Sequence, residues 1–280
     1  MTKNILITGA TDGIGLLTAE KLAAQGHELL IHGRNPEKLA AAIDKVKAAG
    51  AKQVSSYQAD LSDFTETRTL IEQIKADHSQ MDIIINNAGI YKTNNPITKD
   101  NLDVRFVVNT LAPYMISKEL LPLLKGESRV INLSSAAQAP VDLDALQGKY
   151  PIEDQFSAYA QSKLAITMWS RTLAEHWRAD LQENAPTIIA VNPASLLASK
   201  MVKEGFGVAG KDMNIGADIL VDLAFKAEYH NCSGQYFDND IGQFSAPHPA
   251  GEDAENRELL VEAIERIVGD DRNIADDQAK

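Results

Sequence analysis

The sequence predicts a single-domain α/β protein in which helices cover both faces of a mostly parallel sheet. Short apolar runs alternate along the chain with longer amphipathic segments, which is typical of strands alternating with helices. The run at residues 82–86 (Asp-Ile-Ile-Ile-Asn) is apolar enough to be buried on both faces, as strands of parallel sheets are. No break in composition divides the 280 residues into two domains.

Each short apolar run predicts one strand, and the segments between them predict helices. Seven strands are expected, at residues 4–8, 27–32, 53–58, 82–86, 129–133, 187–192 and 234–238. Helices are expected at residues 13–25, 36–49, 63–77, 99–124, 157–180 and 254–268. Pro36 suits the first turn of the second helix, and Asp63 or Ser62 can cap the third.

Two stretches, residues 136–156 and 194–212, carry glycines and prolines and fit neither element type. Long irregular insertions in compact domains often serve as lids or binding loops, so we expect both to border the substrate. The domain is expected to span residues 1–269. The acidic residues 270–280 are expected to form a disordered, solubilising tail.

The bulk composition narrows the class of partner. A net charge of -12 argues against a nucleic-acid or anionic-membrane surface, because such partners require a basic footprint. The single cysteine, Cys232, rules out an intrachain disulfide and suits a reducing compartment. No apolar run is long enough to span a bilayer, so no membrane anchor and a cytoplasmic location are expected.

A glycine-rich turn joins the first strand to the first helix. Residues 8–15 read Thr-Gly-Ala-Thr-Asp-Gly-Ile-Gly, and a mere tight turn would not call for three glycines. Glycine lets a phosphate approach the main chain, and the N-terminus of the following helix presents free N–H groups to it. This placement predicts a doubly wound Rossmann fold that binds the pyrophosphate of a dinucleotide through Thr8, Gly9, Gly13, Ile14 and Gly15.

The end of the second strand predicts which dinucleotide is bound. An acid at this position would bind the ribose 2′-hydroxyl of NAD, whereas arginine accommodates a 2′-phosphate. Gly33 and Arg34 stand where the acid is expected. We therefore expect NADP(H) to be preferred over NAD(H), although Arg34 could also be an ordinary surface residue.

Tyr159 and Lys163 are four residues apart in a predicted helix, so their side chains share one face. A free phenol has a pKa of about 10, and a neighbouring cation lowers it. The pair can therefore act as a general acid/base on a hydroxyl or carbonyl group. The spacing also occurs by chance on many helices, so it requires support from the rest of the chain.

Four motifs in order give the chain a family resemblance. They are the glycine-rich turn, residues 86–89 (Asn-Asn-Ala-Gly), Ser134-Ser135 after a strand, and the Tyr159/Lys163 pair. Over residues 4–268 the chain resembles the short-chain dehydrogenase/reductase family, in its single-domain branch. The long segment before Tyr159 resembles the retinol-dehydrogenase-like and protochlorophyllide-reductase-like subgroup.

The resemblance implies roles for individual residues. Tyr159 would be the catalytic acid/base, Lys163 would lower its pKa and bind the nicotinamide ribose, and Asn109 would hold a water in the proton relay. Ser135, in preference to Ser134, would bind the substrate oxygen. Further cofactor contacts would come from Asp60, Leu61, Asn87, Ala88, Gly89 and Pro193. The chain departs from the family at Ala194, where a glycine usually follows the proline.

The expected function is an NADP-dependent oxidoreductase that interconverts a carbonyl and an alcohol on a small or lipophilic aldehyde, ketone or alcohol, with no metal site. An alternative is a sensor or scaffold that binds the cofactor without chemistry, although such proteins typically lose the Tyr or Lys. A third reading, an epimerase or dehydratase of the extended branch, requires a larger C-terminal domain. Relatives commonly pair through their two long central helices, which implies a homodimer or homotetramer.

Overall fold

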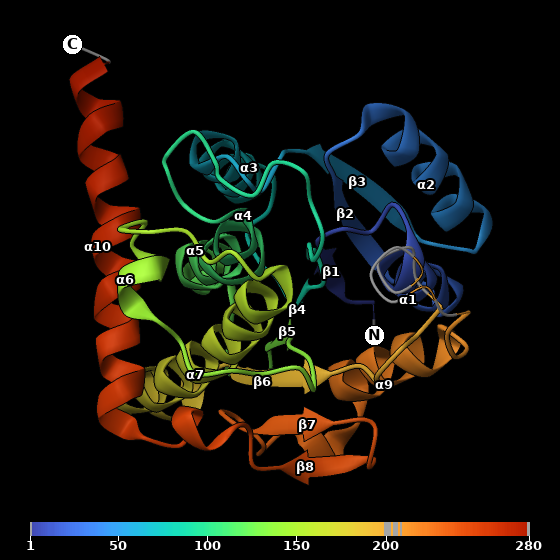
Figure 1. Ribbon diagram of the computed structural model, residues 1–280. Helices are drawn as coiled ribbons and strands as arrows, with labels where there is room; N and C mark the ends of the chain where they lie inside the picture. Colours follow the sequence, from blue (N-terminus) through green and yellow to red (C-terminus); the bar gives the residue numbers. More distant parts are fainter. Residues whose placement is uncertain (1, 199–202, 204–206, 208, 279–280) are drawn as a thin grey trace.

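Eight strands form one sheet in the order β3-β2-β1-β4-β5-β6-β7-β8 in the computed structural model, which describes residues 2–198, 203, 207 and 209–278 (Figure 1). All neighbouring strands are parallel except β7 and β8. The strands are β1 (Asn4–Ile7), β2 (Glu28–Gly33), β3 (Gln53–Gln58), β4 (Ile83–Asn86), β5 (Arg129–Leu133), β6 (Thr187–Asn192), β7 (Tyr236–Asp238) and β8 (Gln243–Ser245). The strand order reverses between β1 and β4, which places a ligand crevice at the carboxyl ends of these strands.

Helices follow most of the strands. They are α1 (Gly13–Ala24), α2 (Pro36–Ala48), α3 (Phe64–Asp77), α4 (Val104–Phe106), the π-helical turn η1 (Val107–Leu111), α5 (Ala112–Glu119), α6 (Leu143–Leu146), α7 (Gln155–Leu181), α9 (Asn214–Phe225) and α10 (Ala254–Gln278). Short 3₁₀ turns lie at Leu121–Leu123, Gln182–Asn184, Ala227–Tyr229 and Pro249–Gly251. Asn35 caps α2 and Asp63 caps α3 through side chains that accept N–H bonds of the first turn.

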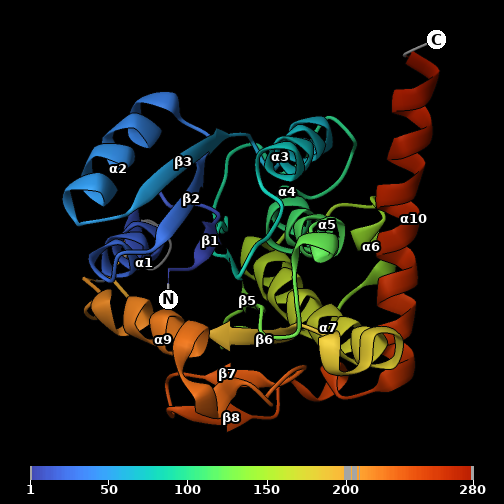
Figure 2. The ribbon, with the colours of Figure 1, turned by 180° about the vertical axis from the view of Figure 1, so that it is seen from behind.

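Two helix layers cover the sheet because successive strand side chains point to opposite faces. Ile5 and Ile7 of β1 pack with α1, α2 and α9, whereas Leu6 packs with α3, α5 and α7. The two views of the ribbon show these layers on opposite sides of the strands (Figures 1 and 2). The predicted α/β class with a mostly parallel sheet and helices on both faces is confirmed.

Helix α10 lies along the outside of α7 in both views (Figures 1 and 2). Leu260 and Ile264 of α10 are fully buried and join the core formed around Trp169 of α7. A buried arginine, Arg257, pairs with Glu175 of α7 at 3.1 Å. The outer side of α7 is therefore covered from within the same chain.

The structure corrects the predicted elements in several places. The sheet has eight strands, not seven, because a three-residue antiparallel strand, β8, extends its edge. Helix α9 was not predicted, since it is almost entirely apolar or small and shows little polar periodicity. The helix expected at 99–124 begins at Val104 and contains the turn η1, and the last helix continues beyond residue 268 to Gln278. The disorder expected for residues 270–280 stays a prediction.

Among the described residues, no helix combines the length and apolar character that crossing a bilayer requires. The cytoplasmic location expected from the sequence stays a prediction.

Candidate active site

A cleft of about 730 Å³ opens at the carboxyl ends of the central strands. Most of the predicted site residues line it, although they come from seven separate segments of the chain. They are Gly9, Gly13, Ile14, Gly15, Arg34, Asp60, Leu61, Asn87, Ala88, Gly89, Ser135, Tyr159, Lys163 and Pro193. Thr8 and Asn109 are buried just behind its wall. The structure therefore brings the whole predicted set together at one place.

The glycine-rich turn forms one end of the cleft. Gly9 and Gly13 have φ angles of 65° and 56°, a backbone region that favours glycine. A Cβ atom at Gly15 would stand 2.3 Å from Asn87 Nδ2, so only glycine lets α1 approach β4 this closely. The Asn87 amide in turn donates to the carbonyls of Thr8 and Gly9, at 2.9 and 3.0 Å. This turn, with α1 starting directly behind it, suits the pyrophosphate of a dinucleotide.

Two basic side chains stand where the adenosine ribose of such a cofactor would lie. Arg34 is exposed directly after β2, and Lys38 lies in the first turn of α2; both line the cleft. The Lys38 ammonium lies 3.0 Å from the Asp12 carboxylate of the glycine-rich turn. Lys38 was missed in the sequence, although a second basic residue close to Arg34 was a usable signal. The pair fits a 2′-phosphate, which requires cationic donors.

The two serines after β5 have different surroundings. Ser134 is buried, and its hydroxyl donates to the main-chain carbonyl of Lys163 at 2.7 Å. Ser135 faces the cleft and hydrogen-bonds the phenol of Tyr159. The geometry therefore agrees with the choice of Ser135 as the serine nearer to the predicted chemistry.

Burial controls the ionisation of Tyr159. Loss of water around the ring raises the pKa of its phenol above the usual value of 10, and the hydrogen bond from Ser135 only partly offsets this effect. The phenol is therefore protonated at neutral pH and is equipped to give a proton. The expected lowering of this pKa by Lys163 is not the dominant effect in the cofactor-free protein.

The environment of Lys163 explains why it has little effect on the pKa of Tyr159. Its side chain is 4% exposed, and burial lowers the pKa of the ammonium to about 7. The ammonium donates to the main-chain carbonyl of Leu133 at 2.6 Å and lies 5.7 Å from the centroid of the Tyr159 ring. A lysine that is only partly charged near neutral pH, and aimed at a carbonyl, stabilises a phenolate weakly.

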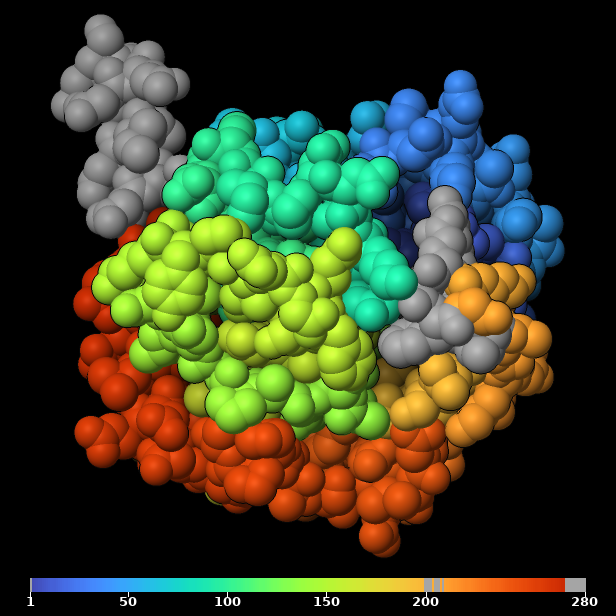
Figure 3. All heavy atoms as spheres, in the orientation of Figure 1, coloured from blue at the N-terminus to red at the C-terminus, as the bar shows by residue number. Residues whose placement is uncertain are grey.

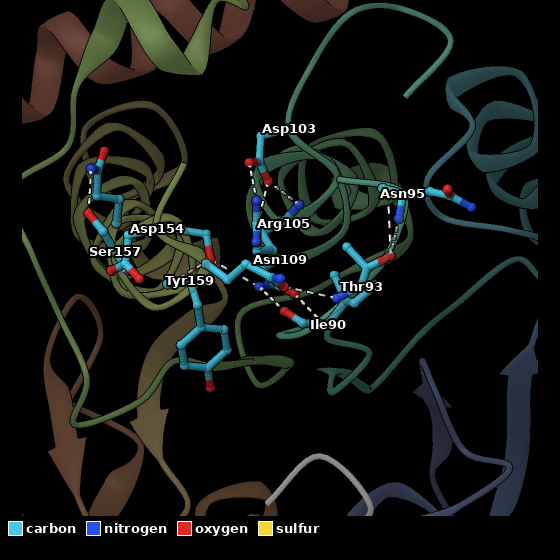
Figure 4. A network of polar contacts seen from close by, with 12 residues as sticks. Ile90, Thr93, Asn95, Asp103, Arg105, Asn109, Asp154, Ser157 and Tyr159 are labelled. Carbon is cyan, nitrogen blue, oxygen red and sulfur yellow. Dashed lines mark hydrogen bonds and ion pairs between the residues drawn. The ribbon is translucent and has the colours of Figure 1, made fainter. Parts of the chain in front are cut away.

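Asn109 lies in the π-helical turn η1, a feature that often marks functional sites. Its side-chain amide is fully used: the oxygen accepts from Ile90 N–H, and the nitrogen donates to the Ile90 carbonyl and to Ser162 Oγ. Figure 4 shows this junction between η1 and the loop after β4, with the Tyr159 ring projecting from α7 beside it. Pro113, four residues later, has no N–H to donate to the Asn109 carbonyl. The carbonyl therefore lacks its α-helical donor, and the Asn109 side-chain amide has no hydrogen left to donate to a relay water.

The loop after β6 keeps an unusual backbone without glycine. Ala194, at the position where the family usually has glycine, has a φ of 120°, and Leu196 has a φ of 57°. Asp240 holds this loop by accepting the backbone N–H of Ser195 at 2.9 Å and the side-chain amide of Asn192, also at 2.9 Å. The expected substrate loop 194–212 lies partly outside the described residues.

An aromatic rim borders Tyr159. The Tyr91 ring, which is 7% exposed, packs 5.1 Å from the Tyr159 ring, and Phe156 contacts Tyr91 edge-on at 6.3 Å. The segments that follow β4 and β5, in green and yellow-green, lie next to each other on the face in Figure 3. Tyr91 carries no signal in the sequence, because its place follows only from the folding of the loop onto α7.

Comparison with known proteins is consistent with this geometry. The family model of short chain dehydrogenases matches residues 3–206. Human (Homo sapiens) retinol dehydrogenase 13 is 31% identical over 286 residues, which cover 95% of this chain and 85% of that protein. A crystal structure of a short chain dehydrogenase from Burkholderia cenocepacia in complex with NADP is 25% identical, with a TM-score of 0.67 over 84% of this chain and 95% of that chain. A protein from Mycobacterium paratuberculosis shares the fold, with a TM-score of 0.78, 24% identity and coverage of 95% and 93%.

Proposed function

Since this chain belongs to the short-chain dehydrogenase family, we propose that it is an NADP-dependent enzyme that interconverts a lipophilic aldehyde or ketone and the corresponding alcohol. Membership makes it an NAD(P)-dependent oxidoreductase acting on CH–OH groups; the choice of NADP and of a lipophilic substrate is our proposal. One observation carries it: the hydroxyls of Ser135 and Tyr159 meet in a cleft whose other end is a glycine-rich turn.

The reacting oxygen would lie between Ser135 and Tyr159. The nicotinamide cofactor supplies the hydride when it is bound, and the protein supplies orientation and a proton. Both hydroxyls can donate to an oxygen that gains negative charge as the carbonyl is reduced. Because the raised pKa keeps the Tyr159 phenol protonated at neutral pH, it can give its proton to that oxygen. The protonated phenol can therefore serve as the acid when a carbonyl is reduced.

Replacement of that proton would start from Lys163. Its ammonium lies 5.7 Å from the centroid of the Tyr159 ring, and a pKa of about 7 lets it both release and accept a proton near neutrality. A water on the main-chain carbonyl of Asn109 would connect Lys163 to solvent. Pro113 supports this role, because it has no N–H to donate to that carbonyl at the α-helical spacing.

The walls beside Tyr159 support an apolar substrate. Tyr91, Val104, Val108 and Leu196 line the cleft, and Phe156 extends the aromatic rim outward. Leu196 and Phe156 are each 43% exposed, so their apolar surface is available to a ligand. These side chains would take up the hydrocarbon part of the substrate.

Replacement of Tyr159 by phenylalanine tests the chemistry. We expect Tyr159→Phe to lower NADPH-dependent reduction of decanal or benzaldehyde by roughly 10²- to 10⁴-fold, the usual contribution of general acid catalysis. Affinity for NADPH should stay within a factor of about three. Tyr229→Phe, which alters a tyrosine packed on Phe237 at the far edge of the sheet, is the matched control. Full turnover by Tyr159→Phe would exclude the mechanism, and tight NADPH binding without reduction of any carbonyl would favour the sensor.

Arg34 and Lys38 carry the cofactor preference. A hydrogen bond to a charged group contributes about 1.5–3 kcal/mol, so Arg34→Gln and Lys38→Gln should each weaken NADPH binding by roughly 10- to 100-fold. NADH binding should hardly change. Lys45→Gln is the control, because Lys45 is exposed on the same helix but does not line the cleft. Equal losses for both cofactors would remove the assignment.

Assembly through the central helices would meet an obstacle. Helix α10 covers the outer side of α7, and its Glu265 bonds Tyr114 and Lys118 of α5. We therefore propose that a homodimer or homotetramer, if formed, uses another surface, which sedimentation of the wild type and of a Leu260→Asp variant would test.

A further inference from the structure

His32 holds a central position between the two loops that would contact the cofactor's adenosine half. It lies near the end of β2, is 3% exposed, and lines the cleft with its ring. The N–H of Gly9, in the glycine-rich turn, donates to His32 Nδ1 at 3.2 Å. The other ring nitrogen, Nε2, lies 3.0 Å from the carbonyl of Ala59, just before Asp60.

These two bonds define the protonation state of the ring. A backbone N–H can only donate, so Nδ1 must be the unprotonated, accepting nitrogen. Nε2 then carries the proton and donates to the Ala59 carbonyl. His32 therefore connects β1, β2 and β3 at their carboxyl ends only while its ring is neutral.

A protonated ring would break this connection. Nδ1–H would face the N–H of Gly9, so two donors would oppose each other in a buried place. Burial lowers the pKa of His32 below 6.5, while the Ala59 carbonyl and the Asp60 carboxylate act in the opposite direction. Other charged side chains on the surrounding elements are Asp12 of the turn, Arg34 and Lys38 after β2, and Glu66 of α3, which accepts the Asp60 N–H at 2.7 Å.

We propose that neutral His32 is a positioning residue that holds the glycine-rich turn in its dinucleotide-binding conformation, and that its protonation releases the cofactor in mild acid. Gly9 is held on its other side by Asn87, whose amide donates to the Gly9 carbonyl at 3.0 Å. Of the His32 and Asn87 side chains, which both bond Gly9, His32 is the one that can titrate. The proposal rests on the proposed function only in taking a nicotinamide dinucleotide as the ligand.

Calorimetric titration with NAD⁺ and NADP⁺ between about pH 5 and pH 8 tests the proposal. NAD⁺ is essential because the 2′-phosphate of NADP⁺ itself titrates near pH 6. For the wild type we expect the Kd of both nucleotides to rise below the pKa of His32, by up to about tenfold per pH unit. Two variants separate the roles of the ring. In His32→Asn, the amide oxygen can accept from Gly9 N–H without titrating, so affinity should be near that of wild type at pH 8 and constant in acid. His32→Leu leaves the N–H unpaired and should bind about tenfold more weakly at every pH.

His27→Asn is the matched control. His27 lies directly before β2, and its pKa is also lowered, but its ring stacks on Phe225 away from the cleft. The pH profile of this variant should equal that of wild type. A second readout is independent of ligand: ¹⁵N NMR of the cofactor-free protein should show the Nε2–H tautomer of His32, and the Gly9 amide shift should follow its titration.

A Kd for NAD⁺ that is the same at pH 5 and pH 8, or an identical pH profile in His32→Asn, would overturn the proposal, as would the Nδ1–H tautomer. Binding without hydride transfer would contradict the proposed function and leave this inference standing. Failure to bind either nucleotide at pH 8 would overturn both.

Discussion

Replacing Lys163 by methionine should stabilise the cofactor-free protein while it abolishes turnover. Lys163 is 4% exposed, and its ammonium bonds only a neutral carbonyl, that of Leu133, among the contacts described. The free energy of burying this ammonium is therefore not recovered from a carboxylate. Methionine is similar in length and apolar, so Lys163→Met removes the charge without leaving a large cavity.

The size of the effect follows from the pKa. Burial lowers the pKa of Lys163 from 10.5 to about 7, and each pH unit corresponds to 1.36 kcal/mol, so keeping the proton costs the folded state roughly 5 kcal/mol. The variant also loses the hydrogen bond to Leu133 and leaves that carbonyl unpaired, which costs about 1–3 kcal/mol. The free energy of unfolding at pH 7 should therefore rise by about 2–4 kcal/mol.

The sign of the pH dependence gives a sharper test. Between about pH 7 and pH 10.5 the unfolded chain binds a proton at Lys163 that the folded protein has released. Wild-type stability therefore rises with pH in this window, by up to about 1.4 kcal/mol per pH unit from this group. Methionine does not titrate, so the advantage of the variant should shrink by about 2 kcal/mol from pH 7 to pH 9.

Urea unfolding of wild type and Lys163→Met at pH 7, 8 and 9 measures this difference, with Lys45→Met as an exposed control on α2. A variant that is less stable than wild type at pH 7 would refute the reasoning. So would an advantage that stays constant from pH 7 to pH 9, because the lysine would then be charged in both states.

Two further substitutions test features around the cleft by urea unfolding. Ala194→Gly should stabilise the protein by about 1 kcal/mol, because a φ of 120° strains alanine. The control Ala185→Gly, at a φ of -67°, should destabilise the protein by about as much. Equal effects of the two substitutions would mean that the backbone at residue 194 is not strained. Asp103→Asn should destabilise the protein by about 3 kcal/mol, because it leaves the fully buried guanidinium of Arg105 without its anion. The control Asp144→Asn, at an exposed ion pair, should change stability by less than about 0.5 kcal/mol. Unchanged stability in Asp103→Asn would mean that Arg105 reaches water.

The sequence predicted the sheet well because its central strands are buried on both faces, which leaves continuous apolar runs such as Ile83 to Ile85. It failed at β8, which has only three residues, and at α9, whose burial depends on packing against α1. The predicted helix boundaries were wrong for a similar reason, because no local feature of residues 99–124 shows that a π-helical turn divides them.

The site divides in a similar way. The glycine-rich turn, Ser135, Tyr159 and Lys163 were predictable because the chemistry requires those residue types at particular spacings. His32 and Tyr91 were not, since each matters through contacts with a segment distant in the chain. The spacing of Tyr159 and Lys163 also says nothing about burial, and burial decides both of their pKa values.

Three costly features of the described residues lie around one cleft. Lys163 buries an ammonium beside a neutral carbonyl, Ala194 adopts a backbone that suits glycine, and Asn109 lies in a π-helical turn. They come from three separate elements, so no single packing requirement accounts for all three. Binding a dinucleotide needs the glycine-rich turn and the basic residues at the opposite end, but none of these features. Destabilising arrangements that persist together are expected where a protein performs chemistry. Their position beside Tyr159 therefore favours an enzyme over a scaffold that only holds the cofactor.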